Sequence, residues 1–203
     1  RYMAGGMFVL IINEFLAERL HTNNQELITE AISCMKYFTY AKGELITKTG
    51  DPICMYTFLA ANGLVRSIYH TATGKEITEC VVSEAGRCIM PSAILDEAAP
   101  VDMEALTYVE VIAFPIDAIR KLEEKYPEIL RMENEVLTEC WLEQREMKRI
   151  RYEYDAKDRY LWFRRTHPGA AEQMMNKHIA SYLDMSPVSL SRIRRQLAGN
   201  IKG

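Results

Sequence analysis

Residues 176–197 read NKHIASYLDMSPVSLSRIRRQL, and this stretch predicts two short helices joined by a tight turn. Apolar side chains fall on one face of the first helix: Ile179, Ala180 and Leu183. Ser186 is a good N-cap and Pro187 suits the first helical position, so a second helix begins there. Its apolar residues also recur at helical spacing: Leu190, Ile193 and Leu197. A small residue where the helices cross completes the pattern of a helix-turn-helix.

The turn of this motif usually needs glycine, because one residue adopts a left-handed backbone conformation. Asp184 stands at that position, and aspartate tolerates the left-handed region at some cost. The non-core faces of the second helix carry serines and arginines: Ser189, Ser191, Arg192, Arg194 and Arg195. A helix that lies against a duplex needs such a surface. The alternative is an ordinary helical hairpin whose arginines form a solvated face.

Charge is unevenly divided along the chain. Residues 155–203 hold nine of the 25 basic residues and four of the 28 acidic ones, a balance of +5 that leaves −8 for residues 1–154. An acidic body with a basic tail is typical of a DNA reader that has a separate domain for another task. We therefore expect the tail to contact double-stranded DNA.

The overall composition is that of a soluble globular protein, with 48% hydrophobic and 26% charged residues. The longest apolar run near the start, 7–12, is too short to span a membrane and lacks a secretion cleavage site. We therefore expect a cytoplasmic protein with no membrane partner.

The cysteines are scattered, odd in number and without a CxxC pair: Cys34, Cys54, Cys80, Cys88 and Cys140. That pattern favours reduced thiols in a cytoplasmic protein, and a metal or cluster site is the alternative. No His/Cys pair has ligand spacing, and the sequence contains no nucleophile elbow, no phosphate-binding glycine loop and no HExxH. We expect no metal, no catalytic residues and no enzyme activity.

Hydrophobic periodicity divides the chain into segments. Residues 13–37 read as helical with a polar break at 21–24. From 37 to 114, short β-branched runs alternate with glycine-containing turns, which predicts an all-β roll, barrel or sandwich. Residues 105–114 are the clearest strand, and 116–125 form a short helix.

The longest helix runs from Glu128 to about Tyr154 without Gly or Pro. One near-heptad seam contains Leu130, Leu137, Gln144, Met147 and Arg151, and a neighbouring face contains Ile129, Met132, Val136 and Cys140. Two apolar faces predict that one packs on the protein's own domain and the other on a second copy, although a plain core helix is the alternative. Any coupling between a ligand pocket and the partner would run through this helix. Asp155 then caps the first helix of the last domain.

The order of these elements resembles the CRP/FNR family of bacterial transcription regulators. The residues that carry the resemblance are 42–44 (KGE), 49–52 (TGDP), 62–66 (NGLVR), 74–77 (GKEI), 105–107 (ALT), 109–111 (VEV) and 190–193 (LSRI). The resemblance implies an α+β fold: a double-stranded, jelly-roll-like β-roll sensor (1–126), a dimerisation helix (127–154) and a winged-helix-type helix-turn-helix domain (155–203). It also implies a homodimer on DNA, with RNA polymerase as a further partner if the protein is an activator.

The resemblance assigns roles to individual residues of the motif. Arg192 would read a guanine edge, and Val188 and Ser189 would also face bases. The expected phosphate contacts are Lys177, His178, Ser191 and Arg195.

The ligand pocket departs from the family pattern. Cyclic nucleotide-binding members carry a Gly-Glu pair and then an Arg-Ser/Thr-Ala run, where this chain has Met90-Pro91 and residues 99–101 (APV). Without the arginine, a buried phosphate would be uncompensated, so we expect no useful binding of cyclic AMP or cyclic GMP. The expected effector-pocket residues are Met90, Pro91, Ile94, Leu95 and Ala99.

These side chains predict an apolar pocket that takes an uncharged or lipophilic effector, or one that has closed. A haem would need an axial ligand such as Cys80, Cys88 or His70, and we expect no cofactor. The competing hypothesis is a β-roll that binds a small molecule or a partner protein, with a helix-turn-helix that no longer reads DNA.

Overall fold

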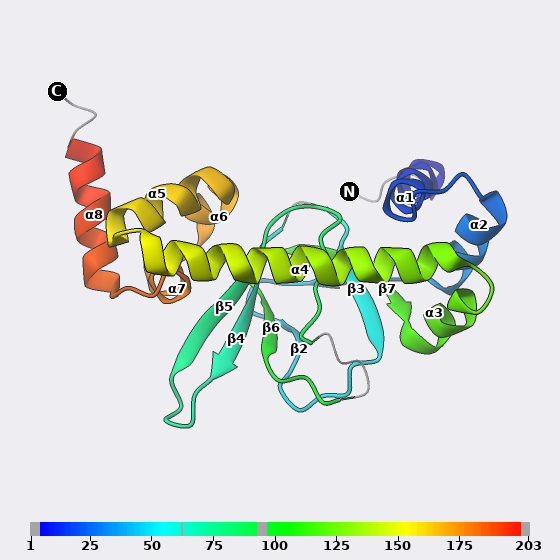
Figure 1. Cartoon of the computed structure of the whole chain (residues 1–203), viewed down its shortest axis with the longest axis horizontal. Helices are drawn as coiled ribbons and strands as arrows, with labels where there is room; N and C mark the ends of the chain where they lie inside the picture. The colour runs from blue at the N-terminus through cyan, green and yellow to red at the C-terminus, as the bar shows by residue number, and fades with distance from the viewer. Residues whose placement is uncertain (1–4, 62, 93–96, 200–203) are drawn as a thin grey trace.

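The computed structural model describes residues 5–61, 63–92 and 97–199, and it has an α+β fold arranged along one long helix. Figure 1 shows helix α4 (Pro127–Glu153) along the whole molecule, with helices α1 to α3 at one end and α5 to α8 at the other. The strands lie against the middle of α4. Within the described residues, no helix is long and apolar enough to cross a membrane.

The N-terminal helices follow the predicted pattern and its break. They are α1 (Gly5–Arg19) and α2 (Gln25–Cys34). The side chain of Asn24 caps α2 by accepting hydrogen bonds from the backbone N–H groups of Glu26 and Leu27. The helical segment ends sooner than expected, because strand β1 (Lys36–Tyr40) begins directly after α2.

Two antiparallel sheets form the jelly-roll-like β-roll. One has the order β1-β7-β3 and the other β2-β6-β4-β5. The remaining strands are β2 (Leu45–Thr47), β3 (Met55–Leu59), β4 (Val65–His70), β5 (Glu76–Val82), β6 (Asp102–Ala105) and β7 (Val109–Pro115). Apolar side chains from both sheets fill the interior, among them Leu59, Val65, Met103 and Val111.

Two expected turns and one expected strand can be compared with the structure. The turn at Thr73-Gly74 joins β4 to β5, with Gly74 at a φ of +77° that favours glycine. Asn62 of the Asn62-Gly63 turn lies outside the described residues. The single strand expected at 105–114 is interrupted, because the chain turns between β6 and β7, where the Thr107 hydroxyl accepts a hydrogen bond from the Leu64 N–H.

Helices α3 (Ile116–Glu123) and α4 lie close to their predicted positions. Pro127 occupies the first position of α4, where its missing N–H has no intrahelical acceptor. Asp155 caps α5 (Ala156–Thr166) as expected, accepting a hydrogen bond from the Asp158 N–H. The domain continues with α6 (Pro168–Gln173), α7 (Asn176–Tyr182) and α8 (Pro187–Gly199). The strands of a wing have no counterpart in the described part of this domain, 155–199.

The C-terminal helices dock on the β-roll of the same chain. Their core side chains, among them Phe163 and Ile179, share one hydrophobic cluster with Leu64 and Val81 of the roll. The Ser181 hydroxyl of α7 accepts a hydrogen bond of 2.9 Å from the backbone N–H of Thr78 in β5. The helix-turn-helix is therefore held against the outer face of the β4–β5 hairpin.

Asp184→Val is expected to lower the free energy of unfolding by about 1–2 kcal/mol, because Asp184 has a φ of +51° and a β-branched side chain is strained there. Asp184→Gly should change it by less than about 1 kcal/mol, since relief of strain is offset by greater freedom of the unfolded chain. Urea unfolding measures both variants, with Gln196→Val on the exposed side of α8 as the control. Equal stability of the Val and Gly variants would contradict the argument.

Candidate DNA interface and effector cavity

Helices α7 and α8 form the helix-turn-helix that the sequence predicts. Asp184 has the left-handed backbone conformation required in the turn. The Ser186 hydroxyl accepts a hydrogen bond of 3.0 Å from the Ser189 N–H and so caps α8, with Pro187 as its first residue. Leu190 and Ile193 are buried against α7 and α5. The core side of the motif is thus fixed, and the opposite side of α8 is left to solvent.

That outer side carries most of the residues expected to meet DNA. Val188 is 61% exposed, and Ser191, Arg192 and Arg195 are exposed too. Neither arginine makes a hydrogen bond or ion pair with any described residue, so both guanidinium groups are available for a ligand. Ser189 is half-buried and its hydroxyl lies 2.8 Å from that of Ser186. Lys177 of α7 is also exposed.

Two residues of the motif are placed differently from the prediction. His178 belongs to α7, which packs on β5, and it is only 4% exposed. The expected phosphate contact is therefore wrong for this conformation. Arg194 does not lie on a free face: its Nε donates to the Tyr160 hydroxyl at 2.8 Å and its Nη2 to the Ala171 carbonyl at 2.8 Å. Arg194 therefore ties α8 to α5 and α6.

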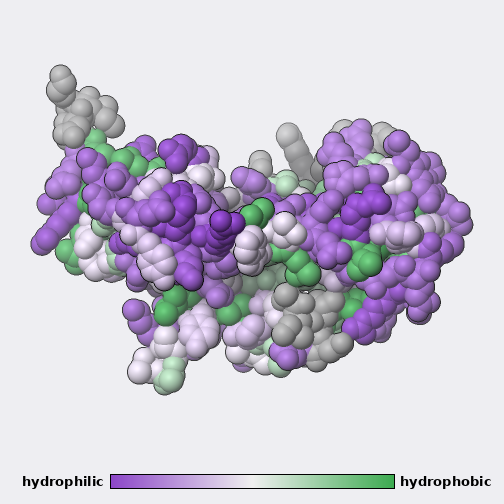
Figure 2. Space-filling view, viewed as in Figure 1, coloured by the Kyte–Doolittle hydropathy of each residue, from purple (hydrophilic) through white to green (hydrophobic). Residues whose placement is uncertain are grey.

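The solvent-facing side of α4 carries an apolar stripe. Leu130, Leu137 and Trp141 are between 41% and 60% exposed, and Tyr152 continues the line toward the end of the helix. Figure 2 shows hydrophobic patches, in green, that interrupt the hydrophilic surface along α4. Trp141 was not part of the predicted seam, although its spacing of four residues from Leu137 places it on the same face.

Met147 does not belong to this stripe. It is buried together with Ile150 in the core of the C-terminal domain, so its assignment to a dimer seam is wrong. The reason is geometric. At about 100° per residue, the three-residue step from Gln144 to Met147 falls about 60° short of a full turn, which places Met147 on the core side. A four-residue step from Gln144 reaches Lys148, which is exposed. Gln144 is exposed, and Arg151 donates a hydrogen bond of 3.3 Å from Nη2 to the Tyr182 carbonyl.

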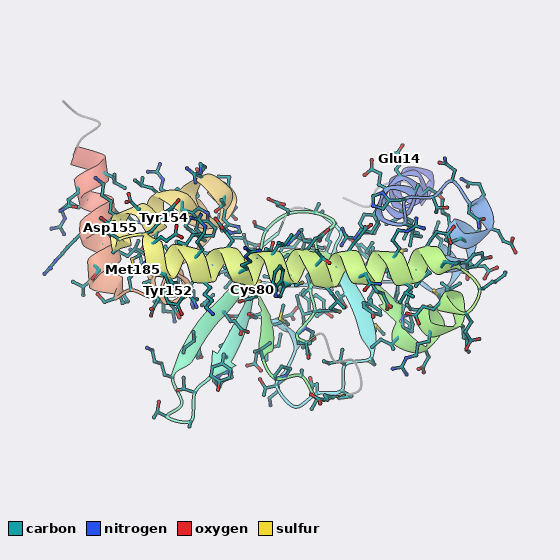
Figure 3. The ribbon with its side chains drawn as sticks, viewed as in Figure 1. Glu14, Cys80, Tyr152, Tyr154, Asp155 and Met185 are labelled. Atoms are coloured by element: carbon teal, nitrogen blue, oxygen red, sulfur yellow. The ribbon has the colours of Figure 1, made fainter. Side chains whose placement is uncertain are left out.

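A cavity of about 290 Å³ opens between the β-roll and the middle of α4. Its wall is formed by β4, β5 and β6, by the segment 83–91 and by one face of α4; Figure 3 shows Cys80 of β5 beside that part of the helix. Met90 and Pro91, two of the predicted effector-pocket residues, line this cavity. Ala99 is buried in the hydrophobic core instead, and Ile94 and Leu95 lie outside the described residues.

The lining is only partly apolar, which differs from the prediction, because charged side chains form one part of the wall. Arg87 donates to Glu139 of α4 at 3.0 Å and also pairs with Glu143 one turn further along. Glu139 accepts from Arg19 of α1 at 2.7 Å, and this hydrogen bond is the main reason that the pKa of Glu139 is lowered. Burial raises the pKa of Glu143. The i, i+4 spacing of the two glutamates was the available sequence signal for a shared acidic face.

Three thiols also line the cavity: Cys80, Cys88 and Cys140. Burial raises the pKa of each of them, to about 12 for Cys80, so all three thiols are neutral near pH 7. Among the described residues, no group of three or more His, Cys, Asp or Glu side chains is arranged to hold a metal ion.

The chain is similar to known proteins in part of its sequence and in its fold. Residues 37–126 match the family model of the cyclic nucleotide-binding domain. No curated protein sequence matches the chain. FixK2 from Bradyrhizobium japonicum has a similar structure, with a TM-score of 0.71 and 16% identity over 82% of this chain and 85% of that one.

Two further solved structures are similar over most of their length. The c-di-GMP responsive global regulator CLP from Xanthomonas campestris has a TM-score of 0.68 and 15% identity over 87% of this chain and 93% of that one. A CRP/FNR family transcriptional regulator from Eubacterium rectale, itself described as putative, has a TM-score of 0.69 and 14% identity over 87% of this chain and 84% of that one. At these identities the likeness establishes the fold.

The burial of His178 predicts a loss of stability in acid. Its pKa is lowered to about 4, mainly by burial and then by the charges of Arg66 and Lys177, from an ordinary value of 6.5. Below pH 6.5 the unfolded chain binds a proton that the folded chain does not bind until about pH 4, so the free energy of unfolding should fall across this window.

His178→Gln should flatten this fall, as measured by urea unfolding at a series of pH values between 6.5 and 4. The slope is the readout, because the variant can differ in absolute stability at every pH. The slope of His167→Gln is measured for comparison, because burial also lowers the pKa of His167. Identical slopes for the parent chain and His178→Gln would contradict the placement of His178.

Proposed function

We propose that this chain, in which a cyclic nucleotide-binding-type domain at 37–126 sits within a CRP/FNR-like fold, is a sequence-specific DNA-binding transcription regulator. The observation that carries the proposal is the exposed side of α8, where Arg192 and Arg195 have no partner among the described residues. A guanidinium free of intramolecular partners can bind a guanine edge with two hydrogen bonds or a backbone phosphate with one or two. The similar solved structures include proteins described as regulators, which supports a regulator rather than an enzyme.

The residue roles within α8 follow from position and exposure. Arg192 lies one and a half turns into the helix and would read a base, with Val188 at the helix start making apolar contact. Arg195, Ser191 and Lys177 are exposed and would bind phosphates, which adds affinity and salt dependence but little specificity. Ser189 is partly engaged in capping α8, so it is a weaker candidate for a base contact than the sequence suggested.

The active form is proposed to be a homodimer paired through α4. Leu130, Leu137 and Trp141 would form the seam, since an exposed apolar stripe on a long helix is what a paired helix buries. A two-fold dimer presents two copies of α8 to two half-sites of DNA. RNA polymerase is a further proposed partner if the regulator is an activator.

The effector is proposed to be something other than a cyclic nucleotide. Among the described residues that line the cavity, the one arginine is Arg87, and it is already paired with two carboxylates of α4, so it has little capacity left for a phosphate. An anion that enters the cavity would either break these ion pairs or lie beside carboxylates without a cation of its own. Either outcome costs free energy.

Selection of duplex DNA by the purified chain tests the DNA-reading role. We expect enrichment of a two-fold symmetric site. Arg192→Ala should relax the preference at one position of each half-site, with a loss of about 1–3 kcal/mol there. Arg195→Ala should weaken binding evenly across sequences and reduce the dependence on salt. A folded, dimeric protein that selects no sequence and shows no salt-dependent binding would contradict the proposal.

Trp141→Asp is expected to convert the dimer into a monomer, because it places a charge within the apolar seam of α4. The matched control is Leu142→Asp, which also replaces an exposed apolar side chain but lies about 100° around the helix. Light scattering after size-exclusion chromatography gives the mass of each. The pairing assignment would be wrong if Trp141→Asp stayed dimeric, or if both variants dissociated equally.

A further inference from the structure

Carboxylates dominate the rim of the cavity between the β-roll and α4. Glu79, Glu84, Glu139 and Glu143 line it, against the single guanidinium of Arg87 among the described lining residues. His167 also lines the cavity, but burial lowers its pKa, so its ring adds no positive charge near pH 7. The electrostatic character of the cavity is therefore the opposite of what a phosphate ligand requires.

Two of these carboxylates have no compensating cation. Glu139 and Glu143 share Arg87, and Glu139 also pairs with Arg19. The side-chain carboxylates of Glu79 and Glu84 make no ion pair or hydrogen bond with any described residue, although both residues line the cavity. A site with unpaired carboxylates beside low-dielectric walls attracts cations.

A buried hydroxyl inside the cavity also lacks a partner. Ser67 of β4 is only 3% exposed, and its Oγ has no hydrogen-bond partner among the described residues. The hydrogen-bond register between β4 and β5 shifts next to it, between Arg66 and Ile68. Buried polar atoms are normally paired, so an unpaired hydroxyl that faces a cavity indicates a position for a ligand atom.

The remaining wall is apolar and uncharged. Met90, Met103 and Val82 line it, and the thiols of Cys80 and Cys88 are neutral. Such a wall suits an aliphatic chain, because thioether and methyl groups bury CH₂ groups without a polar cost.

We propose that the cavity binds a small aliphatic amine in its ammonium form, with the ammonium group at the carboxylate rim, the alkyl chain on the apolar wall and a polar atom at Ser67. The proposal rests on the proposed function, since it names the effector class of that regulator. The proposal explains why this domain of the cyclic nucleotide-binding type keeps an open cavity although the arginine that lines it is already paired.

Isothermal titration calorimetry on the full chain in the absence of DNA tests the proposal with 1,4-diaminobutane as the probe. We expect saturable binding of the diamine, and no saturable binding of 1,4-butanediol, which has the same length without charge, or of cyclic AMP. Keeping DNA out matters, because diamines bind DNA directly. The outcome does not depend on DNA reading, so a failure here and a failure of DNA selection are separate results.

Glu79→Gln removes an unpaired carboxylate without freeing Arg87, and it should weaken diamine binding about tenfold, as expected for the loss of one charge-assisted hydrogen bond. Ser67→Ala should weaken it to a smaller degree. Glu153→Gln removes a carboxylate of α4 that lies outside the cavity and pairs with Arg149, so it is the control and should leave diamine binding unchanged. Diamine binding that is equal in all of these variants, or cyclic AMP that binds when the diamine does not, would overturn the proposal.

Discussion

One buried face of α4 serves two hydrophobic cores, and the arrangement of the molecule depends on it. Ile129, Met132 and Val136 pack with the N-terminal helices and one sheet, and about three to four turns after Val136, Met147 and Ile150 pack with the C-terminal helices. Between these two groups the same face carries Glu139 and Glu143, which line the cavity. The apolar face is interrupted where the helix borders the cavity, and Arg19 and Arg87 compensate part of the buried charge.

Strand β5 makes a second connection between the cavity and the helix-turn-helix. Cys80 and Val82 line the cavity, while Thr78 donates a hydrogen bond to Ser181 of α7, and Val81 packs in the core of the C-terminal domain. The sequence had suggested that coupling must run through the long helix, because that element alone was expected to touch both the pocket and the partner. The contact of α7 with the roll could not be read from its sequence pattern. Cys80, which lines the cavity, is only two residues along β5 from Thr78, which contacts α7. Displacement of β5 by a ligand would therefore reach the helix-turn-helix of the same chain.

Local signals in the sequence predicted the elements, and contacts between distant segments decided the exceptions. The caps at Asp155 and Ser186 and the left-handed turn at Asp184 involve only neighbouring residues, so their residue types were sufficient. His178 and Met147 were misplaced because their burial comes from docking of the C-terminal domain on the roll and on α4. The charge of the cavity was missed for the same reason: Arg87 and Glu139 are 52 residues apart, and no periodicity joins them.

The cavity and the proposed seam occupy the same turns of α4, and this sets a thermodynamic link between them. Glu139, Cys140 and Glu143 line the cavity, while Leu137, just before them, and Trp141, between them, are exposed to solvent. A ligand that binds the paired helices more tightly than the single helix must strengthen pairing by the same factor, because the coupling free energy is reciprocal. In the proposed dimer, two α8 helices would reach successive half-sites only when α4 is paired, so occupancy of the cavity would control DNA affinity through the dimer even if α8 itself never changed conformation.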